Sequence, residues 1–321
     1  MKRILVKKKE TKMQYQDIKN GRFYLGDCLE VMKEIPDGVI DMILCDLPYG
    51  TTNNKWDSVI PFDKLWEQYN RICKENAAMV FTASQPFTTA LIASNIENFR
   101  YELIWDKTKG GNFLLAKKQP MKSHENVLIF YNKPTTYNPQ MEVRGKPRKK
   151  GGGKASENFG ATPTVSHNNE YYPKSIMTYS TGSRVDKFHP TQKPVELFEY
   201  LIRTYTNEGE LVLDNTAGSG TTAIAAENAG RKWVCIEQNE EYATKAVERI
   251  WNHEAKPQEK PASKIQIDSD IPLPEGEKIA YVMKGGPMDG QTLYLSSPGT
   301  LSFSLHGQTG HYNSENVWVP A

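Results

Sequence analysis

The chain has 321 residues, 38% of them hydrophobic and 24% charged, with a net charge of +2, so one large or two modest domains with a sizeable core are expected. The sequence excludes a membrane-spanning helix, because no apolar run approaches the length of a bilayer span, and we interpret the basic N-terminal segment, 1–20, as a charged arm because it lacks the apolar core of a signal peptide. The 4 cysteines and 6 histidines show no metal-type spacing. They predict neither a disulfide framework nor a metal site, which fits a reducing, cytoplasmic setting.

The first part of the chain alternates strand-like and helix-like segments. The run "VIDMILCD" is almost continuously apolar, as expected of a parallel strand that is covered on both faces. In "FDKLWEQYNRICK", Leu65, Tyr69 and Ile72 share one helical face. Such alternation predicts an α/β fold with a parallel sheet. The expected strands are 23–25, 39–46, 77–83, 101–107 and 125–132, and the expected helices are 28–35 and 62–74.

A long, basic segment follows. From Pro134 to about Lys187 the regular pattern fades into a stretch rich in Gly, Pro, Asn, Tyr and basic residues, including "RGKPRKKGGGKAS". Between Lys107 and Lys187 the sequence holds 15 Lys and Arg against 5 Asp and Glu, a surplus of 10 positive charges. This segment either binds a polyanionic partner or is a solvated, flexible insert, and its charge alone favours neither.

Regular patterns return at "HPTQKPVELFEYLIRTY", where Pro194 suits the first turn of an amphipathic helix. A strand ("ELVLD"), a glycine-rich turn ("NTAGSGTT"), a helix closed by Gly230, a second strand ("KWVCIE") and a helix over 240–251 come next. A linker rich in Pro, Lys and Glu, 253–264, then leads to residues 265–321. Their short apolar runs between Gly and Pro turns predict a small β-rich module of unknown role.

The glycine-rich turn lies where ligands bind in open α/β sheets, at the carboxyl end of a strand. Asp214 ends that strand, and Gly218 and Gly220 allow the backbone to approach a ligand closely. Glu237 ends the next strand, where it could accept hydrogen bonds from two ribose hydroxyls. A phosphate-binding P-loop is excluded, because no Lys follows the last glycine. The combination favours a nucleoside site over a purely structural tight turn.

The stretch "ILCDLPYGT" places an acid, a proline and a tyrosine at the end of an apolar strand. A single acid such as Asp46 most often caps a helix or joins a salt bridge. Here the restrained turn at Pro48 and the ring of Tyr49 follow it, which suits a planar ligand with an exocyclic NH2 group. The acid would accept an N–H while the ligand stacks on the tyrosine. This arrangement is typical of a pocket for a flipped-out nucleobase.

Three motifs together resemble one enzyme family. "DLPYG" is similar to the D-P-P-Y signature of amino-directed DNA methyltransferases, with Leu47 in place of the first proline. "HPTQKPVELFEYLI", followed by "LDNTAGSGTTAIAA" and "CIE", resembles the S-adenosylmethionine region of that family, and the motif order resembles its permuted β class over roughly Phe23 to Ile250. The resemblance implies a Rossmann-like S-adenosylmethionine-dependent methyltransferase fold over 21–252, with a target-recognition insert at about 107–188.

The resemblance also implies roles for individual residues. Asp46 and the backbone carbonyl of Leu47 would accept hydrogen bonds from the target amino group. Pro48 would restrain the turn, and Tyr49 would stack on the base. The cofactor S-adenosyl-L-methionine would be bound by Asp27 and Cys28 at its adenine, by Glu237 at its ribose, by Lys193 and Pro194 near its methionine moiety, and by the loop residues Asp214, Gly218, Gly220 and Thr221.

Double-stranded DNA is the partner that the motifs and the basic segment predict. Its phosphates need Lys and Arg, and its base edges need forked or amide side chains. A homodimer is compatible with the resemblance, whereas neither a membrane nor a metal is required. The expected DNA-contacting residues are Arg144, Lys146, Arg148, Lys149, Lys150 and Lys154, and Asn158, Asn168 and Asn169 offer amides for base edges.

The expected reaction is methylation of adenine N6 in DNA by base flipping, since an Asp at the start of the signature leans toward adenine in this family. Two acceptors that hold the hydrogens of the amino group would expose its lone pair and stabilise the developing positive charge. The alternatives are methylation of cytosine N4, methylation of an amino group in RNA, and a catalytically inactive DNA-binding protein.

Overall fold

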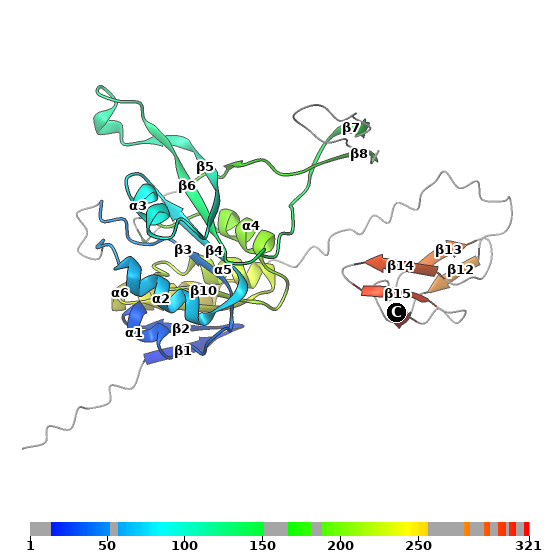
Figure 1. The fold of residues 1–321 in the computed structure, drawn as a ribbon, viewed down its shortest axis with the longest axis horizontal. Helices are drawn as coiled ribbons and strands as arrows, with labels where there is room; N and C mark the ends of the chain where they lie inside the picture. Colours follow the sequence, from blue (N-terminus) through cyan, green and yellow to red (C-terminus); the bar gives the residue numbers. More distant parts are fainter. Residues whose placement is uncertain are drawn as a thin grey trace, which may run out of the picture. The chain divides into compact units, whose positions relative to one another are not determined.

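The computed structural model divides the chain into two compact units, Met1–Gln258 and Glu259–Ala321. The larger unit carries a nine-stranded sheet (Figure 1). Within the part of the chain that the structure describes, no helix is long and apolar enough to cross a membrane. The described residues are 14–51, 57–150, 166–181, 188–189 and 191–255, together with the C-terminal strands 279–282, 292–295, 301–305, 308–312 and 318–320.

The large sheet is mixed but mostly parallel. In spatial order its strands are β1 (Gln14–Ile18), β2 (Gly21–Leu25), β11 (Lys232–Glu237), β10 (Leu211–Asp214), β3 (Ile40–Cys45), β4 (Cys73–Ala83), β6 (Lys122–Phe130), β5 (Phe99–Gly111) and β9 (Ile176–Thr178). From β2 to β4 every neighbouring pair is parallel, and β5 and β9 are parallel as well. β1 pairs antiparallel with β2, and β6 pairs antiparallel with both β4 and β5. The expected α/β class is confirmed, and the expectation of a parallel sheet holds for its central part.

Two groups of helices pack on the two faces of this sheet. On one face lie α1 (Cys28–Met32), α2 (Phe62–Ile72) and α3 (Phe87–Ser94), and on the other lie α4 (Val195–Tyr205), α5 (Thr221–Ala229) and α6 (Glu240–Asn252). The central strand β3 shows why its sequence is apolar apart from Asp41. Met42 and Leu44 belong to one core cluster, whereas Ile43 and Cys45 belong to the other, and all four are fully buried. Alternate side chains of a strand point to opposite faces, so a strand covered on both sides needs apolar residues throughout.

Several elements lie where the sequence pattern indicated none. Within the expected N-terminal arm, β1 pairs with β2, and only its last residue, Ile18, is buried. The helix α3 follows β4 without a strongly amphipathic pattern. In the segment expected to be irregular, β7 (Glu142–Lys150) and β8 (Ser166–Tyr171) form a two-stranded antiparallel sheet. Cross-strand pairing, and not burial, stabilises these polar strands. Hydrophobic periodicity does not detect strands of this kind.

The described part of the second unit consists of short strands. β12 (Ile279–Val282) pairs with β13 (Thr292–Leu295). A three-stranded sheet contains β14 (Leu301–Leu305), β15 (Gln308–Tyr312) and β16 (Trp318–Pro320).

Candidate active site

The two neighbouring strands β3 and β10 end at the same edge of the sheet and carry the two predicted motifs. Their parallel register sets Leu213 opposite Ile43, so the loops that follow the two strands lie side by side. The hydroxyl of Thr216 donates a hydrogen bond to the backbone carbonyl of Asp46 at 3.2 Å and joins the loops. Residues of both loops line one cavity of about 550 Å³. The motifs, 170 residues apart in the chain, therefore form a single site, at the edge where open α/β sheets bind ligands.

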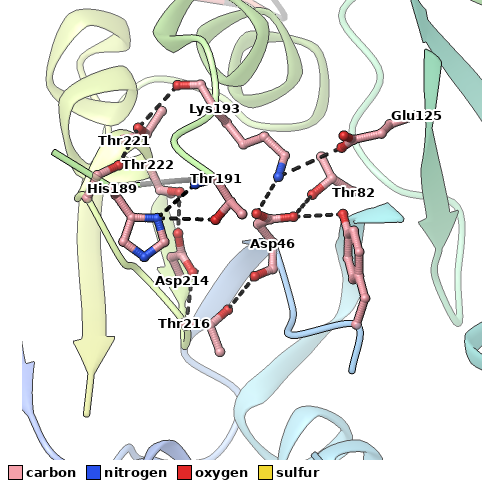
Figure 2. A network of polar contacts seen from close by, with 12 residues as sticks. Asp46, Thr82, Glu125, His189, Thr191, Lys193, Asp214, Thr216, Thr221 and Thr222 are labelled. Carbon is pink, nitrogen blue, oxygen red and sulfur yellow. Dashed lines mark hydrogen bonds and ion pairs between the residues drawn. The ribbon is translucent and has the colours of Figure 1, made fainter. Parts of the chain in front are cut away.

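Three side chains orient the carboxylate of Asp46, and Figure 2 shows the contacts of Thr82 and Lys193 among them. Its Oδ1 accepts hydrogen bonds from the hydroxyls of Tyr49 at 2.8 Å and Thr82 at 2.5 Å. Its Oδ2 accepts a charged hydrogen bond from Lys193 Nζ. The ring of Tyr49 stacks on Phe87, with ring centroids 5.0 Å apart. One carboxylate oxygen is thus held by neutral donors of neighbouring elements, and the other carries a cation.

Lys193 lies almost buried between two carboxylates. Besides Asp46, its Nζ faces Glu125 Oε2 at 3.8 Å, and Glu125 Oε1 pairs with Lys107 at 3.0 Å. Burial alone would lower the pKa of Lys193, but Asp46 and Glu125 outweigh burial and raise this pKa above its usual value. In the same way, burial would raise the pKa of Glu125, but Lys193 and Lys107 hold it below its usual range. Two ammonium groups and two carboxylates therefore balance one another in the cavity wall.

The glycine loop is anchored by the acid at the end of β11. The backbone N–H of Gly218 donates to Glu237 Oε2 at 2.9 Å, and the N–H of Asn239 donates to Oε1 at 2.8 Å. Gly218 has a φ of +48°, and a Cβ at this position would meet the ring of His189 at 3.2 Å. A side chain there would crowd the cavity wall, so the loop requires glycine. Each oxygen of Glu237 keeps a further lone pair for a ligand in the cavity.

Asp214 ends β10 and is buried beneath the same loop. It accepts hydrogen bonds from the hydroxyl of Thr222 and, at 3.0 Å, from the N–H of Thr216. Burial raises the pKa of Asp214 to about 7, although these two hydrogen bonds oppose the shift. Asp214 is therefore partly protonated near neutral pH in the folded protein.

This shifted pKa predicts a pH-dependent loss of stability that Asp214→Asn removes. Between pH 4 and 7 the unfolded chain has released the proton of Asp214 while the folded chain keeps it, so stability falls as pH rises, by at most about 1.4 kcal/mol per pH unit. Urea unfolding of the protein without added ligand at pH 5, 6 and 7 measures this slope. We expect the stability of Asp214→Asn relative to wild type to increase with pH across this range. Parallel stability curves for the two proteins would show that Asp214 titrates normally.

Asp27 and Cys28 lie at the start of α1, on another part of the cavity wall. The carboxylate of Asp27 caps the helix by accepting the backbone N–H groups of Leu29 at 2.9 Å and Glu30 at 3.2 Å. Burial raises the pKa of the Cys28 thiol to about 11, so it stays protonated. At this position the side chain is a small apolar contact.

Most of the predicted residues come together in this cavity, with two exceptions among the cofactor residues. Gly220 takes a left-handed conformation with φ of +72° at the start of α5, where a Cβ would meet Ile250 at 2.9 Å. Pro194 lies at the N-terminal cap of α4. Neither lines the cavity, so both shape the backbone behind its wall. The predicted residues that line the cavity are Asp27, Cys28, Asp46, Leu47, Pro48, Tyr49, Lys193, Asp214, Gly218, Thr221 and Glu237.

The predicted DNA-contacting residues lie on the separate β7–β8 sheet. There Arg148 is paired with Asn168, and the guanidinium of Arg144 lies 5.4 Å from the ring centroid of Tyr171. Lys154 and Asn158 fall outside the described residues. Of the described predicted residues on this sheet, none lines the cavity. The group on β7 and β8 contains Arg144, Lys146, Arg148, Lys149, Lys150, Asn168 and Asn169.

Sequence reasoning missed Thr82, Glu125, His189 and Thr216, which complete the network or the wall of the cavity. Glu125 was missed because β6 runs antiparallel to β4, which brings its first residues to the edge where β3 and β4 end. In a purely parallel sheet this acid would lie at the opposite edge. His189 opens the motif "HPTQKP", and burial lowers its pKa to about 4, so it is neutral at neutral pH. The only sequence signal for any of these four residues was the location of His189 within a recognised motif.

The family model described as DNA methylase (N6_N4_Mtase) matches residues 40–248. A similar protein is the DNA adenine methyltransferase YhdJ of Escherichia coli (strain K12), which is 28% identical over 240 residues that cover 70% of this chain and 81% of that protein.

The fold is shared with solved structures of methyltransferases. The structure of the M1.HpyAVI–SAM complex has a TM-score of 0.51 and 23% identity and covers 72% of this chain and 98% of its own. The PvuII DNA methyltransferase (cytosine-N4-specific) has a TM-score of 0.52 and 18% identity and covers 74% and 94%. The expected Rossmann-like methyltransferase fold is thereby confirmed.

Proposed function

Because the chain belongs to the N6/N4 DNA methylase family, we propose that it methylates the N6 amino group of adenine in double-stranded DNA after flipping the base out of the duplex. The methyl donor of this family is S-adenosylmethionine. The observation that carries the proposal is the common cavity of Asp46 and Gly218, which sets a carboxylate beside the glycine loop. A methyl acceptor and a methyl donor can therefore be held next to each other.

The residues of the glycine loop fit the cofactor. Gly218 leaves the cavity wall open where a Cβ would meet His189, and Glu237 presents carboxylate oxygens at the end of a strand, where a ribose binds in related α/β sites. Asp27 lies on the wall at the start of α1, and we assign the adenine of the cofactor to that region. When bound, S-adenosylmethionine supplies a methyl group that is already activated by its sulfonium.

On the acceptor side, we assign Asp46 Oδ2 to the target amino group. Tyr49 and Thr82 both donate to Oδ1, which fixes the carboxylate and leaves Oδ2 directed at Lys193. The Nζ of Lys193 also lies 5.9 Å from the ring centroid of Tyr49. The ammonium thus holds the place in which an amino group would sit beside the carboxylate and near the ring. The entering base displaces Lys193, and Asp46 then stabilises the positive charge that develops on the amino nitrogen.

Adenine N6 is preferred because the signature begins with Asp46 and because the similar YhdJ is a DNA adenine methyltransferase. Cytosine N4 is the second candidate, since the same carboxylate could hold either NH2 group. In both cases the basic residues of β7, including Arg144, Arg148 and Lys149, are proposed to contact DNA phosphates.

The test is transfer of a labelled methyl group from S-adenosylmethionine to enzymatically amplified duplex DNA, followed by digestion and mass spectrometry of the nucleosides. N6-methyladenine is the expected product. N4-methylcytosine would select the second candidate. Absence of label in any DNA, despite measurable cofactor binding, would refute DNA methylation, and the same assay with RNA distinguishes the nucleic acids.

We expect Glu125→Gln to lower the kcat/KM for DNA by about tenfold. When the base displaces the ammonium of Lys193 from Asp46, Glu125 is the carboxylate that remains beside it, and hydrogen bonds to charged groups are worth about 1.5–3 kcal/mol. The matched control is Glu102→Gln on the neighbouring strand β5, whose carboxylate binds Asn126. Cofactor affinity should remain unchanged in both variants. Equal kcat/KM in the two variants would exclude this role of Glu125.

A further inference from the structure

The strands β5 and β6 extend past the sheet as a hairpin (Figure 1), and its tip carries exposed apolar side chains. The partner strand β4 pairs with β6 only as far as Asn126, so the first residues of β6 project beyond it. The tip contains a short 3-10 helix, Phe113–Leu115. Phe113 is 72% exposed and Leu114 is 83% exposed, the two highest values among the large apolar side chains of the described residues. Two adjacent apolar side chains presented to water at a hairpin tip indicate a surface that becomes covered.

The flanks of this tip carry only positive charge. The sequence from Lys107 to Lys122 contains 5 Lys and neither Asp nor Glu. Lys107 pairs with Glu125 and Lys122 binds Ser84, whereas Lys109 and the adjacent lysines 117 and 118 are exposed. An apolar tip between exposed lysines is complementary to a polyanion that also offers apolar surface. A nucleic-acid duplex has both properties, with phosphates outside and stacked bases inside.

The base of the same hairpin forms part of the active-site wall. Trp105 and Lys107 of β5 and Glu125 of β6 all line the cavity. Phe113 follows Lys107 by six residues, a reach of at most about 20 Å at roughly 3.3 Å per residue. The tip is therefore connected by a short, paired hairpin to the cavity proposed to receive the target base.

We propose that Phe113 and Leu114 form an apolar wedge that enters the base stack beside the flipped nucleotide, while Lys109, Lys117 and Lys118 contact the flanking phosphates. The inference rests on the proposed DNA methylation. Extruding a base leaves a gap in the stack and costs unstacking energy, and apolar side chains inserted between base steps offset this cost in other DNA-binding proteins. The wedge thus assigns a function to the part of the basic segment nearest the cavity.

The test compares Phe113→Ser/Leu114→Ser with the control Ile96→Ser, another exposed apolar side chain, 61% exposed, outside the hairpin. Methylation is measured on enzymatically amplified duplex DNA, and cofactor affinity and oligomeric state are measured in parallel. We expect the double variant to lose about 10- to 100-fold in kcat/KM for DNA, the range of a base–aromatic stacking contact. Its cofactor affinity and oligomeric state should match those of the wild type, and Ile96→Ser should retain full activity.

Two further variants separate stacking from charge. The single variant Phe113→Trp keeps a large ring beside the unchanged Leu114. It should methylate duplex DNA about as well as the wild type, unlike the double serine variant. Lys117→Gln/Lys118→Gln should reduce the salt dependence of DNA binding by about two units of slope, because each phosphate contact contributes roughly one.

The outcomes are distinct. If the wild-type protein methylates DNA and Phe113→Ser/Leu114→Ser has the same kcat/KM, the wedge is overturned and the proposed function stands. A change of oligomeric state in the double variant overturns it too, and identifies the tip as an interface between copies of this chain. If the wild-type protein methylates no DNA, the proposed function and the wedge fail together.

Discussion

Replacing Asp46 with Asn is expected to lower the rate of methyl transfer by about 10³-fold and to leave S-adenosylmethionine affinity within about twofold. The substitution keeps the shape of the side chain but removes the negative charge that faces the amino nitrogen as it becomes positive. Removing one preorganised electrostatic partner of a developing charge typically costs 10²–10³ in kcat. Single-turnover kinetics with labelled cofactor measures the chemical step, and calorimetry measures cofactor binding.

The matched control for this experiment is Asp41→Asn, at the opposite end of the same strand β3. Asp41 pairs with Lys74 at 2.6 Å and accepts the N–H of Leu211 at 2.9 Å, so its substitution affects stability and not the cavity. It should lower the melting temperature while transfer persists. Wild-type turnover by Asp46→Asn would remove this carboxylate from the mechanism.

Glu237→Ala is expected to weaken S-adenosylmethionine binding by about 100-fold or more. The proposed ribose site loses a charged acceptor, and each hydrogen bond to a charged group is worth about 1.5–3 kcal/mol. The substitution also releases the N–H groups of Gly218 and Asn239, which the carboxylate holds in the folded protein. Isothermal titration calorimetry with the cofactor and no DNA isolates this effect.

Glu241→Ala serves as the control for charge, because Glu241 lies near Glu237 in the sequence, at the start of α6, and pairs with Lys245 at the surface. Its cofactor affinity should equal that of wild type. Should Glu237→Ala bind the cofactor as tightly as Glu241→Ala, the ribose assignment would be wrong and the acid would serve only to anchor the loop.

The sequence predicted the components of the site better than their contacts. "DLPYG" and "NTAGSGTT" each contain a short-range pattern, and the positions of Asp46 and Gly218 followed from the rule that ligands bind at the carboxyl ends of parallel strands. The contact between Lys193 and Asp46 joins residues 147 positions apart, and no local pattern contains it. The resemblance implied a place for this lysine near the cofactor, whereas in the structure its ammonium binds the carboxylate of Asp46.

The direction of β6 in the sheet could not be predicted from the sequence either. Its apolar run "NVLIF" is compatible with either strand direction, because a strand buried on both faces has the same composition in a parallel or an antiparallel pair. The hairpin connection with β5 sets the direction of β6 and places Glu125 beside Lys193. The same hairpin holds Phe113 and Leu114, which a charge count over the basic segment does not single out.

The pairing of β3 with β10 fixes the distance between the two loops that follow these strands. Neighbouring strands lie about 4.8 Å apart, a spacing set by main-chain hydrogen bonds and independent of the side chains that they carry. The lateral separation of the loop after β3, which contains Asp46, from the glycine loop is therefore set by the backbone. We expect that surface hairpins and inserts can be exchanged to read different DNA sequences without resetting the distance over which the methyl group travels.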